Sequence, residues 1–186
     1  MAQTASNMLP LGSKAKNFNL KDTVSQDMVS LDSAKGLHAT VIMFICNHCP
    51  FVKHVNAELV KMAKAYTSKG VNFIAISSND VEKYPQDSPD KMAQNAIEEG
   101  YIFPYLYDQT QEVAKAYQAA CTPDFYVFDK DLLLTYRGQL DDSRPGNDIP
   151  VTGSDLRHAL DCVLANTENK QEQKPSIGCN IKWKVS

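Results

Sequence analysis

The chain has 186 residues, of which 43% are hydrophobic and 22% charged, values typical of one globular domain with a sizeable core. Its net charge of −3 argues against a nucleic-acid-binding protein, which normally carries a basic excess. No apolar run approaches the roughly 18 residues that span a bilayer, and the first residues lack the pattern of a secretory signal. We therefore expect a cytoplasmic protein with reduced thiols and with neither nucleic acid nor membrane as a partner.

The first part of the chain predicts a hairpin followed by two strands with a helix between them. Apolar and polar residues alternate around a polar turn in 17–36, which is typical of a hairpin. Two nearly continuous apolar runs, 38–45 and 71–77, indicate strands that are buried on both faces. Between them, apolar residues recur at helical spacing in 50–68, and Gly70 is a plausible stop.

The middle of the chain predicts two more helices and a short strand. A polar loop over 79–90 leads into a helix over 89–100, which has proline near its start and glycine at its end. A short apolar piece, 105–108, precedes a segment of helical composition, 110–120.

The last part predicts a hairpin, a helix and a tail. The strands 124–129 and 132–138 flank a polar turn and are typical of an antiparallel pair. Thr152 is positioned to cap a last helix over 153–166. Strands that alternate with helices imply a parallel core, and the late hairpin adds antiparallel strands. The expected fold is therefore α/β, with a mixed sheet and helices on both faces.

Two cysteines, Cys46 and Cys49, lie where the first buried strand gives way to a helix. The first amides of a helix lack intrahelical partners and carry partial positive charge, so they lower the pKa of a thiol placed there. We place Cys46 at this helix start and expect it to be more acidic than Cys49. His48, between the cysteines, adds a donor or a positive charge. Because Cys49 follows about one turn later, one thiol can attack a substrate and the other can resolve the mixed disulfide.

Two other interpretations of the pair stay open at this point. A structural zinc site needs four ligands, and the sequence has no second CxxC or HxxxH pair, so Cys121 or Cys179 would complete a set only through the fold. Alternatively, both cysteines only pack, since free cysteine is often a small hydrophobe. A CxxC in a cytosolic chain at a strand–helix junction favours redox chemistry over both.

These segments, taken in order, resemble the thioredoxin-like superfamily in its redoxin, or AhpC/TSA-like, branch. "FICNHCPF" is similar to the redox-active CxxC of that fold, and "CTPDFYVFDKDLLLTYRG" to the segment whose cis-proline faces it. "KAKNFNLKD" with "MVSLDSAKG" resembles an added N-terminal hairpin, and "FIAISSND" the third-strand segment. The most similar group is a set of peroxiredoxin-like redoxins with CNHCP and a PSIGCNIKW-type tail.

The resemblance implies a thioredoxin-like fold, in which helices flank a central mixed β-sheet, with an added N-terminal hairpin and a C-terminal tail. It divides the chain into an extension over 1–11, a redoxin domain over 12–165 and a tail over 166–186 that docks on the domain. By position, Cys46 is then the exposed nucleophile and Cys49 the buried resolving thiol.

The resemblance also implies roles for the residues around the pair. The Thr122–Pro123 bond is expected to be cis, with Thr122 offering its backbone to an extended substrate. His48 matches the histidine of disulfide-forming members, which stabilises the reduced form. The residues expected to support the site are Asn47, His48, Pro50, Thr122 and Pro123.

Two further cysteines are candidate redox thiols. Cys121 lies two residues before the proline that faces the pair, and Cys179 lies in the apolar patch of the tail. Ile177, Ile181 and Trp183 alternate in this patch, which suits an extended segment anchored on the body by Ile177 and Trp183.

The sequence also departs from two family patterns. Peroxiredoxins carry a proline, three residues, a threonine, two residues and the peroxidatic cysteine; with Cys49 in the last place, Cys46 replaces the threonine and Ile42 the proline. Their active-site arginine has no counterpart near Thr122. Thioredoxin carries a buried aspartate six residues before its first cysteine, where this chain has Thr40. The group that accepts the Cys49 proton is therefore not identified by the pattern.

We therefore expect a thiol–disulfide oxidoreductase that uses the Cys46–Cys49 pair, with no cofactor and no metal. Its expected partners are a disulfide-containing protein or a small thiol or peroxide substrate, together with a reductant or oxidant. The alternatives are a thiol-dependent peroxidase and, from a different class, a copper- or zinc-binding module that uses Cys46, Cys49 and His48.

Overall fold

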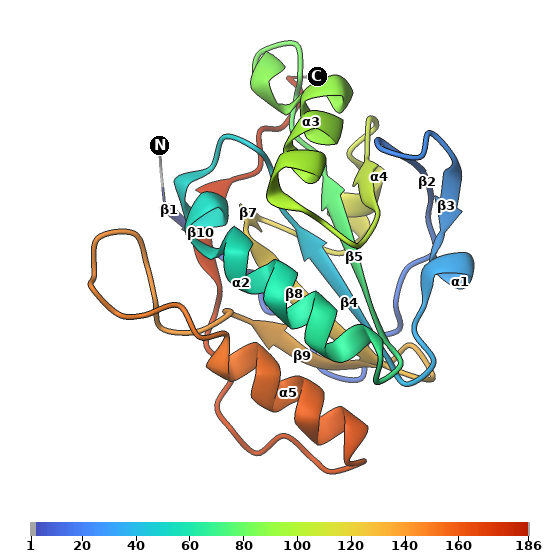
Figure 1. Ribbon diagram of the computed structural model, residues 1–186, viewed down its shortest axis with the longest axis vertical. Coiled ribbons are helices and arrows are strands. Elements are labelled where there is room, and N and C mark those ends of the chain that lie inside the picture. The colour runs from blue at the N-terminus through green and yellow to red at the C-terminus, as the bar shows by residue number, and fades with distance from the viewer. Residues whose placement is uncertain (1–2, 186) are drawn as a thin grey trace.

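Six consecutive buried residues make β4 (Ala39–Phe44) an interior strand of the main sheet in the computed structural model, which describes residues 3–185 (Figure 1). β5 (Val71–Ser77) pairs with β4 in parallel, and β8 (Asp124–Asp129) pairs with it antiparallel on the other side. Both neighbours are also largely buried, as the continuous apolar runs of the sequence predict.

The remaining strands extend this sheet to the order β3-β2-β6-β5-β4-β8-β9. β2 (Asn19–Asp22) and β3 (Met28–Ser30) form the expected N-terminal hairpin, and β6 (Tyr105–Tyr107) joins β2 to β5. β9 (Leu134–Gly138) pairs antiparallel with β8 at the other edge. The sheet is therefore mixed, as expected.

Helices cover both faces of the main sheet. Alternate residues of β4 point to opposite faces and so belong to two separate cores. Val41 and Met43 belong to the core beneath α2 (Pro50–Thr67), α3 (Pro89–Glu99) and α5 (Ser154–Leu164), whereas Ile42 and Phe44 belong to the core on the other face. The second face carries the short helices α1 (Leu31–Ala34) and α4 (Glu112–Ala116). Within residues 3–185, no helix combines the length and the apolar character needed to cross a membrane.

Two helix boundaries differ from the prediction for backbone reasons. α4 is shorter than 110–120, because Gln111 and Gln118 have φ values of 65° and 52°, in the left-handed region, and so bound the helix. Thr152 does not cap α5: the N-cap is Gly153, and the backbone N–H of Thr152 instead donates to Asp141.

A second, smaller sheet has the order β1-β10-β7 and lies beside the start of α2 (Figure 1). In it, β10 (Ile177–Asn180) lies between β1 (Gln3–Ala5) and β7 (Cys121–Thr122), antiparallel to both. Ile181 is buried, whereas the two expected anchors, Ile177 and Trp183, are 37% and 38% exposed. Backbone pairing and Ile181 therefore hold the tail, and the expected anchors contribute less.

The absence of a side chain at Gly178 allows β10 to lie against the backbone before Pro123. A Cβ at this position would lie 1.9 Å from the carbonyl oxygen of Thr122 and 2.6 Å from its carbonyl carbon. Neither atom belongs to a flexible side chain, so the contact is relieved only when the two strands move apart.

We expect Gly178→Ala to lower the free energy of unfolding by about 1–3 kcal/mol, the usual cost of overpacking a tight contact. Denaturant titration of both proteins measures the difference. Gln171→Ala, an exposed position in the segment before β10, is the control and should match the wild type. A Gly178→Ala protein as stable as the control would contradict the close packing of β10.

Candidate functional site

The chain leaves the sheet at Cys46 and enters α2 at Cys49. The amide of Ile45 still donates to Ile76 at 3.0 Å, so the ladder ends just before Cys46. Cys49 is the N-cap of α2, and Pro50 occupies the first helical position, where a missing N–H costs nothing. The positive end of the helix therefore lies at Cys49, not at Cys46 as the sequence suggested.

Both thiols of the pair are buried, which corrects the expectation of an exposed Cys46. Cys46 is 2% exposed and Cys49 is fully buried. The Sγ of Cys46 lies 3.4 Å from Oγ1 of Thr122 and 3.9 Å from Nδ1 of His48, and these side chains shield it.

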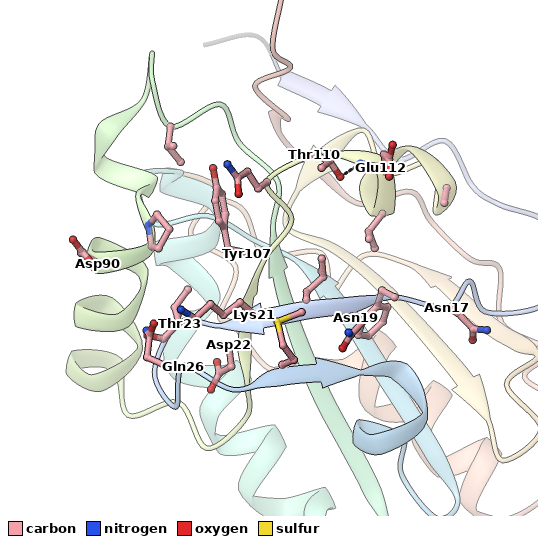
Figure 2. A pocket seen from close by; sticks show the side chains of 18 residues that line it. Asn17, Asn19, Lys21, Asp22, Thr23, Gln26, Asp90, Tyr107, Thr110 and Glu112 are labelled. Atoms are coloured by element: carbon pink, nitrogen blue, oxygen red, sulfur yellow. Dashed lines mark hydrogen bonds between the residues drawn. The ribbon is translucent and has the colours of Figure 1, made fainter.

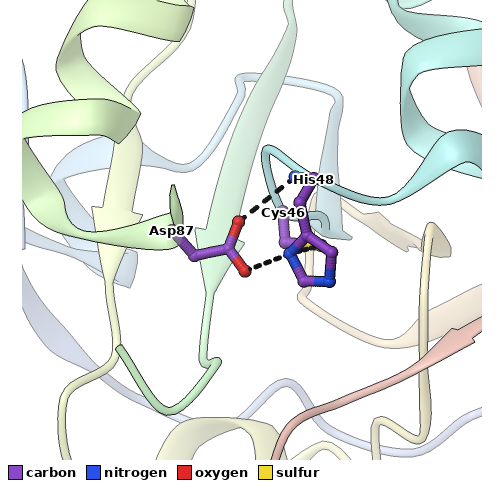
Figure 3. A group of neighbouring side chains, drawn as sticks. All are labelled: Cys46, His48 and Asp87. Atoms are coloured by element: carbon purple, nitrogen blue, oxygen red, sulfur yellow. Dashed lines mark hydrogen bonds and ion pairs between the residues drawn. The ribbon is translucent and has the colours of Figure 1, made fainter. Parts of the chain in front are cut away.

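The loop that carries His48 is held by Asp87, a fully buried carboxylate at the end of a short 3-10 turn, Pro85–Asp87. Oδ1 accepts the backbone N–H groups of Asn47 at 2.9 Å and His48 at 3.2 Å. Oδ2 lies 2.6 Å from Nδ1 of His48 (Figure 3). It also accepts from Asn79 at 2.8 Å. Four bonds fill the acceptor sites of this carboxylate, so Asp87 fixes the loop.

The side chains of Asn47 and His48 are also fixed. Asn47 donates to the carbonyl of Gln86 at 3.0 Å and accepts from the hydroxyl of Tyr105 at 3.0 Å. The ring of His48 stacks on Tyr84, with ring centroids 5.6 Å apart. The residues between the two cysteines therefore form a rigid bridge between α2 and the loop after β5.

The surroundings shift the pKa values of the two thiols in opposite directions. The pKa of Cys49 falls from 9.0 to about 5, mainly because Cys46 donates a hydrogen bond to it, with further help from the Cys179 thiol and the amides of Val52 and Cys179. The pKa of Cys46 rises well above 9.0 because of that same bond, its burial and the negative charge of Asp87. The more acidic thiol is thus Cys49, the reverse of the sequence expectation, because the helix amides and the neighbouring thiols face it.

Thr122 and Pro123 lie against the pair, and the bond between them is cis, as predicted. The Sγ of Cys49 lies 3.2 Å from the carbonyl oxygen of Thr122. The backbone of Thr122 is not open to a substrate strand, however, because it pairs with Cys179 of β10. The expected role of Thr122 in pairing with an extended substrate is therefore taken, in this structure, by the chain's own tail.

The two other candidate thiols differ in their relation to the pair. The Sγ of Cys179 lies 2.9 Å from that of Cys49. Cys121 is fully buried, and its thiol points to the carbonyl groups of Pro123 and Ser176 at 3.7 and 3.8 Å. Burial raises the pKa of Cys121. The structure thus brings Cys179 into the site and turns Cys121 away from it.

Cys46, His48 and Asp87 also offer possible metal-ligand atoms within 4.8 Å of one another (Figure 3). Both oxygens of Asp87 already accept two hydrogen bonds each, so a metal ion would have to replace the bonds that hold the loop. This geometry fits a hydrogen-bonded support better than a ligand set.

A large open groove lies away from the thiols. It has a volume of about 910 Å³ and runs along β2 to the start of α4, with Asn19, Lys21, Tyr107, Thr110 and Glu112 among its lining residues (Figure 2). None of the lining residues is a cysteine. The groove therefore has no direct part in the chemistry of the pair.

Sequence reasoning missed Asp87, Asn79 and Tyr105. All three follow or lie on strands whose carboxyl ends meet at the edge where β4 ends, and ligands and reactive groups gather at such edges. That topology singles out the loop over 79–90, but this loop contains several acidic residues, and only the fold identifies which one is buried.

Comparison with solved structures gives two extensive matches. An uncharacterized conserved protein from Geobacillus kaustophilus is 61% identical, with a TM-score of 0.98, over 100% of this chain and 98% of that one. A hypothetical protein from Sinorhizobium meliloti 1021 is 44% identical, with a TM-score of 0.96, over 98% of this chain and 100% of that one.

More distant structures share the fold alone. A thiol:disulfide interchange protein of the thioredoxin family from Chlorobium tepidum TLS is 17% identical, with a TM-score of 0.64, over 84% of this chain and 99% of that one. No curated protein matches the sequence. The model of the AhpC/TSA family matches residues 11–137, which is more than half of the chain and includes the Cys46–Cys49 segment and the cis-proline. The chain therefore belongs to the AhpC/TSA family and has a thioredoxin-like fold.

Proposed function

We propose that the protein is a thiol–disulfide oxidoreductase that works through Cys46 and Cys49. The observation that carries the proposal is the contact of both thiols with Thr122 before the cis-proline: Cys46 with its Oγ1 and Cys49 with its carbonyl oxygen. Both sulfurs therefore lie in one buried site at the end of β4. Family membership and the thioredoxin-like fold support the same chemistry.

The reduced pair carries one proton near neutral pH, because the thiolate of Cys49 and the thiol of Cys46 share it through their hydrogen bond. When the proton moves to Cys49, the Cys46 thiolate attacks a substrate disulfide. A bond forms between Cys46 and one substrate sulfur, and the other sulfur leaves as a thiolate that takes up the Cys49 proton. The Cys49 thiolate then attacks Cys46 and releases the second substrate thiolate, so the substrate is reduced and a Cys46–Cys49 disulfide remains.

The burial of Cys46 constrains the substrate. At 2% exposure, Cys46 is almost fully covered, so a substrate disulfide reaches its sulfur only after the side chains of Thr122 and His48 move aside. The backbone of Thr122 is covered by β10, so an extended peptide has no free edge there. We therefore favour a small-molecule disulfide as the direct substrate.

The two alternative functions find less support within residues 3–185. The arginines donate to groups other than the Cys46 and Cys49 sulfurs: Arg137 to Asp124 and Gln118, Arg144 to Gln139, Asp141 and Ser143, and Arg157 to Glu58 and Thr152. A peroxidase mechanism in which a guanidinium polarises the peroxide would therefore have no arginine bonded to either sulfur of the pair. In the metal-binding alternative, a metal ion on Asp87 would have to displace the hydrogen bonds that this carboxylate accepts.

Cys46→Ser and Cys49→Ser should each lower turnover of hydroxyethyl disulfide, with dithiothreitol as reductant, by at least about 100-fold, because a serine hydroxyl is not ionised near neutral pH and cannot replace a thiolate. Steady-state assays of the purified proteins measure this. Cys162→Ser, at a half-buried cysteine on α5, is the control and should keep full turnover. If either pair variant keeps near wild-type turnover, the dithiol mechanism is wrong.

The thiolate absorbance of the reduced protein should disappear as the pH falls through about 5, because the pKa of Cys49 is held near that value. An ultraviolet titration measures the transition, and Cys49→Ser should remove it. The pKa of Cys49 in the folded protein lies below its ordinary value of 9.0, so ionisation of Cys49 stabilises the fold. Its contribution to the free energy of unfolding should be complete above pH 9, decrease between pH 9 and 5, and be absent below pH 5. A single transition near pH 8.5 would contradict the assignment.

The reduction potential of the pair should lie above the roughly −270 mV of thioredoxin, because hydrogen bonds that stabilise the thiolate favour the reduced form. Equilibration with glutathione buffers, followed by quantification of both forms, gives the value. His48→Ala should move the potential toward that of thioredoxin, since it removes a polar group 3.9 Å from the Cys46 sulfur. A wild-type value at or below that of thioredoxin would show that these contacts do not set the potential.

A further inference from the structure

The tail strand β10 delivers a third thiol to the pair. Cys179 is in register with Thr122 across the β10–β7 ladder, and the carbonyl oxygen of Thr122 lies 3.2 Å from the Sγ of Cys49. Gly178, the residue before Cys179, lets the strands approach this closely. The Sγ of Cys179 consequently lies 2.9 Å from the Sγ of Cys49, with both residues buried.

This separation is close to that of a covalent bond. A disulfide has a sulfur–sulfur distance of about 2.05 Å, so the two sulfurs must approach each other by roughly 0.9 Å. In contrast, the contacts of Cys121 point its thiol toward backbone carbonyls.

We propose that Cys179 is a further redox residue, which exchanges with the Cys46–Cys49 disulfide to form a second, alternative disulfide between Cys49 and Cys179. The inference rests on the proposed function for its starting point, the Cys46–Cys49 disulfide. The exchange adds no oxidant, because it only moves an existing disulfide by one position.

The step is balanced within the site. The thiolate of Cys179 attacks the Sγ of Cys49, the Cys46–Cys49 bond breaks, and Cys46 leaves as a thiolate that takes up the proton lost by Cys179. No electrons leave the protein. The product holds a Cys49–Cys179 disulfide and a free Cys46 thiol, which is again able to meet a substrate.

The charge of the pair controls when this step is possible. In the reduced site, the pKa of Cys179 is raised from 9.0 to about 12, first by burial and then by the hydrogen bond with Cys49 and the negative charge of Cys49. Oxidation of the pair removes the Cys49 thiolate and with it this contribution. Cys179 therefore becomes easier to deprotonate in the state in which Cys49 can be attacked.

The experiment maps disulfides in the full-length Cys46→Ser variant. The reduced protein is treated with diamide, which takes up two electrons and two protons from a pair of thiols, then blocked with N-ethylmaleimide and digested with trypsin. Cys46 and Cys49 share the tryptic peptide 36–53, whereas Cys179 lies in 171–182 and Cys121 in 116–130. In this variant a Cys49–Cys179 bond therefore joins two peptides, and its mass differs from that of every other pairing. In wild type, where Cys46–Cys179 would give the same mass, fragmentation of the joined peptides shows which cysteine of 36–53 carries the bond.

We expect the joined peptides 36–53 and 171–182 to account for most of Cys49 in Cys46→Ser, and to be present beside the internal Cys46–Cys49 bond in oxidised wild type. Cys121→Ser should keep the joined species. Cys179→Ser, which keeps a hydrogen-bond donor but no sulfur, should lose it and hold all its disulfide as Cys46–Cys49.

Two outcomes would overturn the inference: no joined peptides in Cys46→Ser while wild type forms Cys46–Cys49, or, if Cys46→Ser does not fold, no joined peptides in oxidised wild type. The proposed function is judged separately, by turnover of hydroxyethyl disulfide. Joined peptides in a wild-type protein without turnover would refute the oxidoreductase while still showing the bond between Cys49 and Cys179.

Discussion

The buried carboxylate of Asp87 is the constraint on which the site depends. A charge without solvent contact is tolerated only when hydrogen bonds satisfy it, and here all four come from Asn47, His48 and Asn79. The residues between the two cysteines are thereby bound to the loop after β5. The same carboxylate places a negative charge beside Cys46, which makes ionisation of that thiol harder.

The start of α2 and the buried carboxylate of Asp87 shift the pKa values of two cysteines in opposite directions, although these cysteines are only three residues apart. Cys49 is the N-cap of α2, and the neighbouring Cys46 thiol together with nearby backbone amides lowers the pKa of its sulfur. Cys46 lies outside the helix, between the Asp87 carboxylate and Thr122. The second cysteine of the CxxC is consequently the more acidic one.

Local sequence patterns were sufficient for the elements and much of the site, but not for its contacts. The apolar runs of β4 and β5, the helical spacing of α2 and the positions of Cys46, Cys49 and Pro123 all depend on short-range signals that a sequence carries. The burial of Cys46, the bonds of Asp87 to Asn47 and His48, and the approach of Cys179 depend on segments separated by 39 to 130 positions. Ile177 and Trp183 illustrate the same limit, because alternation predicts an extended segment without showing which face is covered.

The sheet β1-β10-β7 has a consequence for the two ends of the chain. β10 is held on one side by Thr122, beside the thiols, and on the other by Gln3–Ala5, so the first strand and the last are neighbours although almost the whole chain separates them. The spacing of Cys179 from Cys49 is therefore set from both termini. Trimming Gln3–Ala5 would leave one edge of β10 unpaired and loosen Cys179. The distance between the Cys179 and Cys49 sulfurs therefore depends on a strand at the opposite end of the described chain.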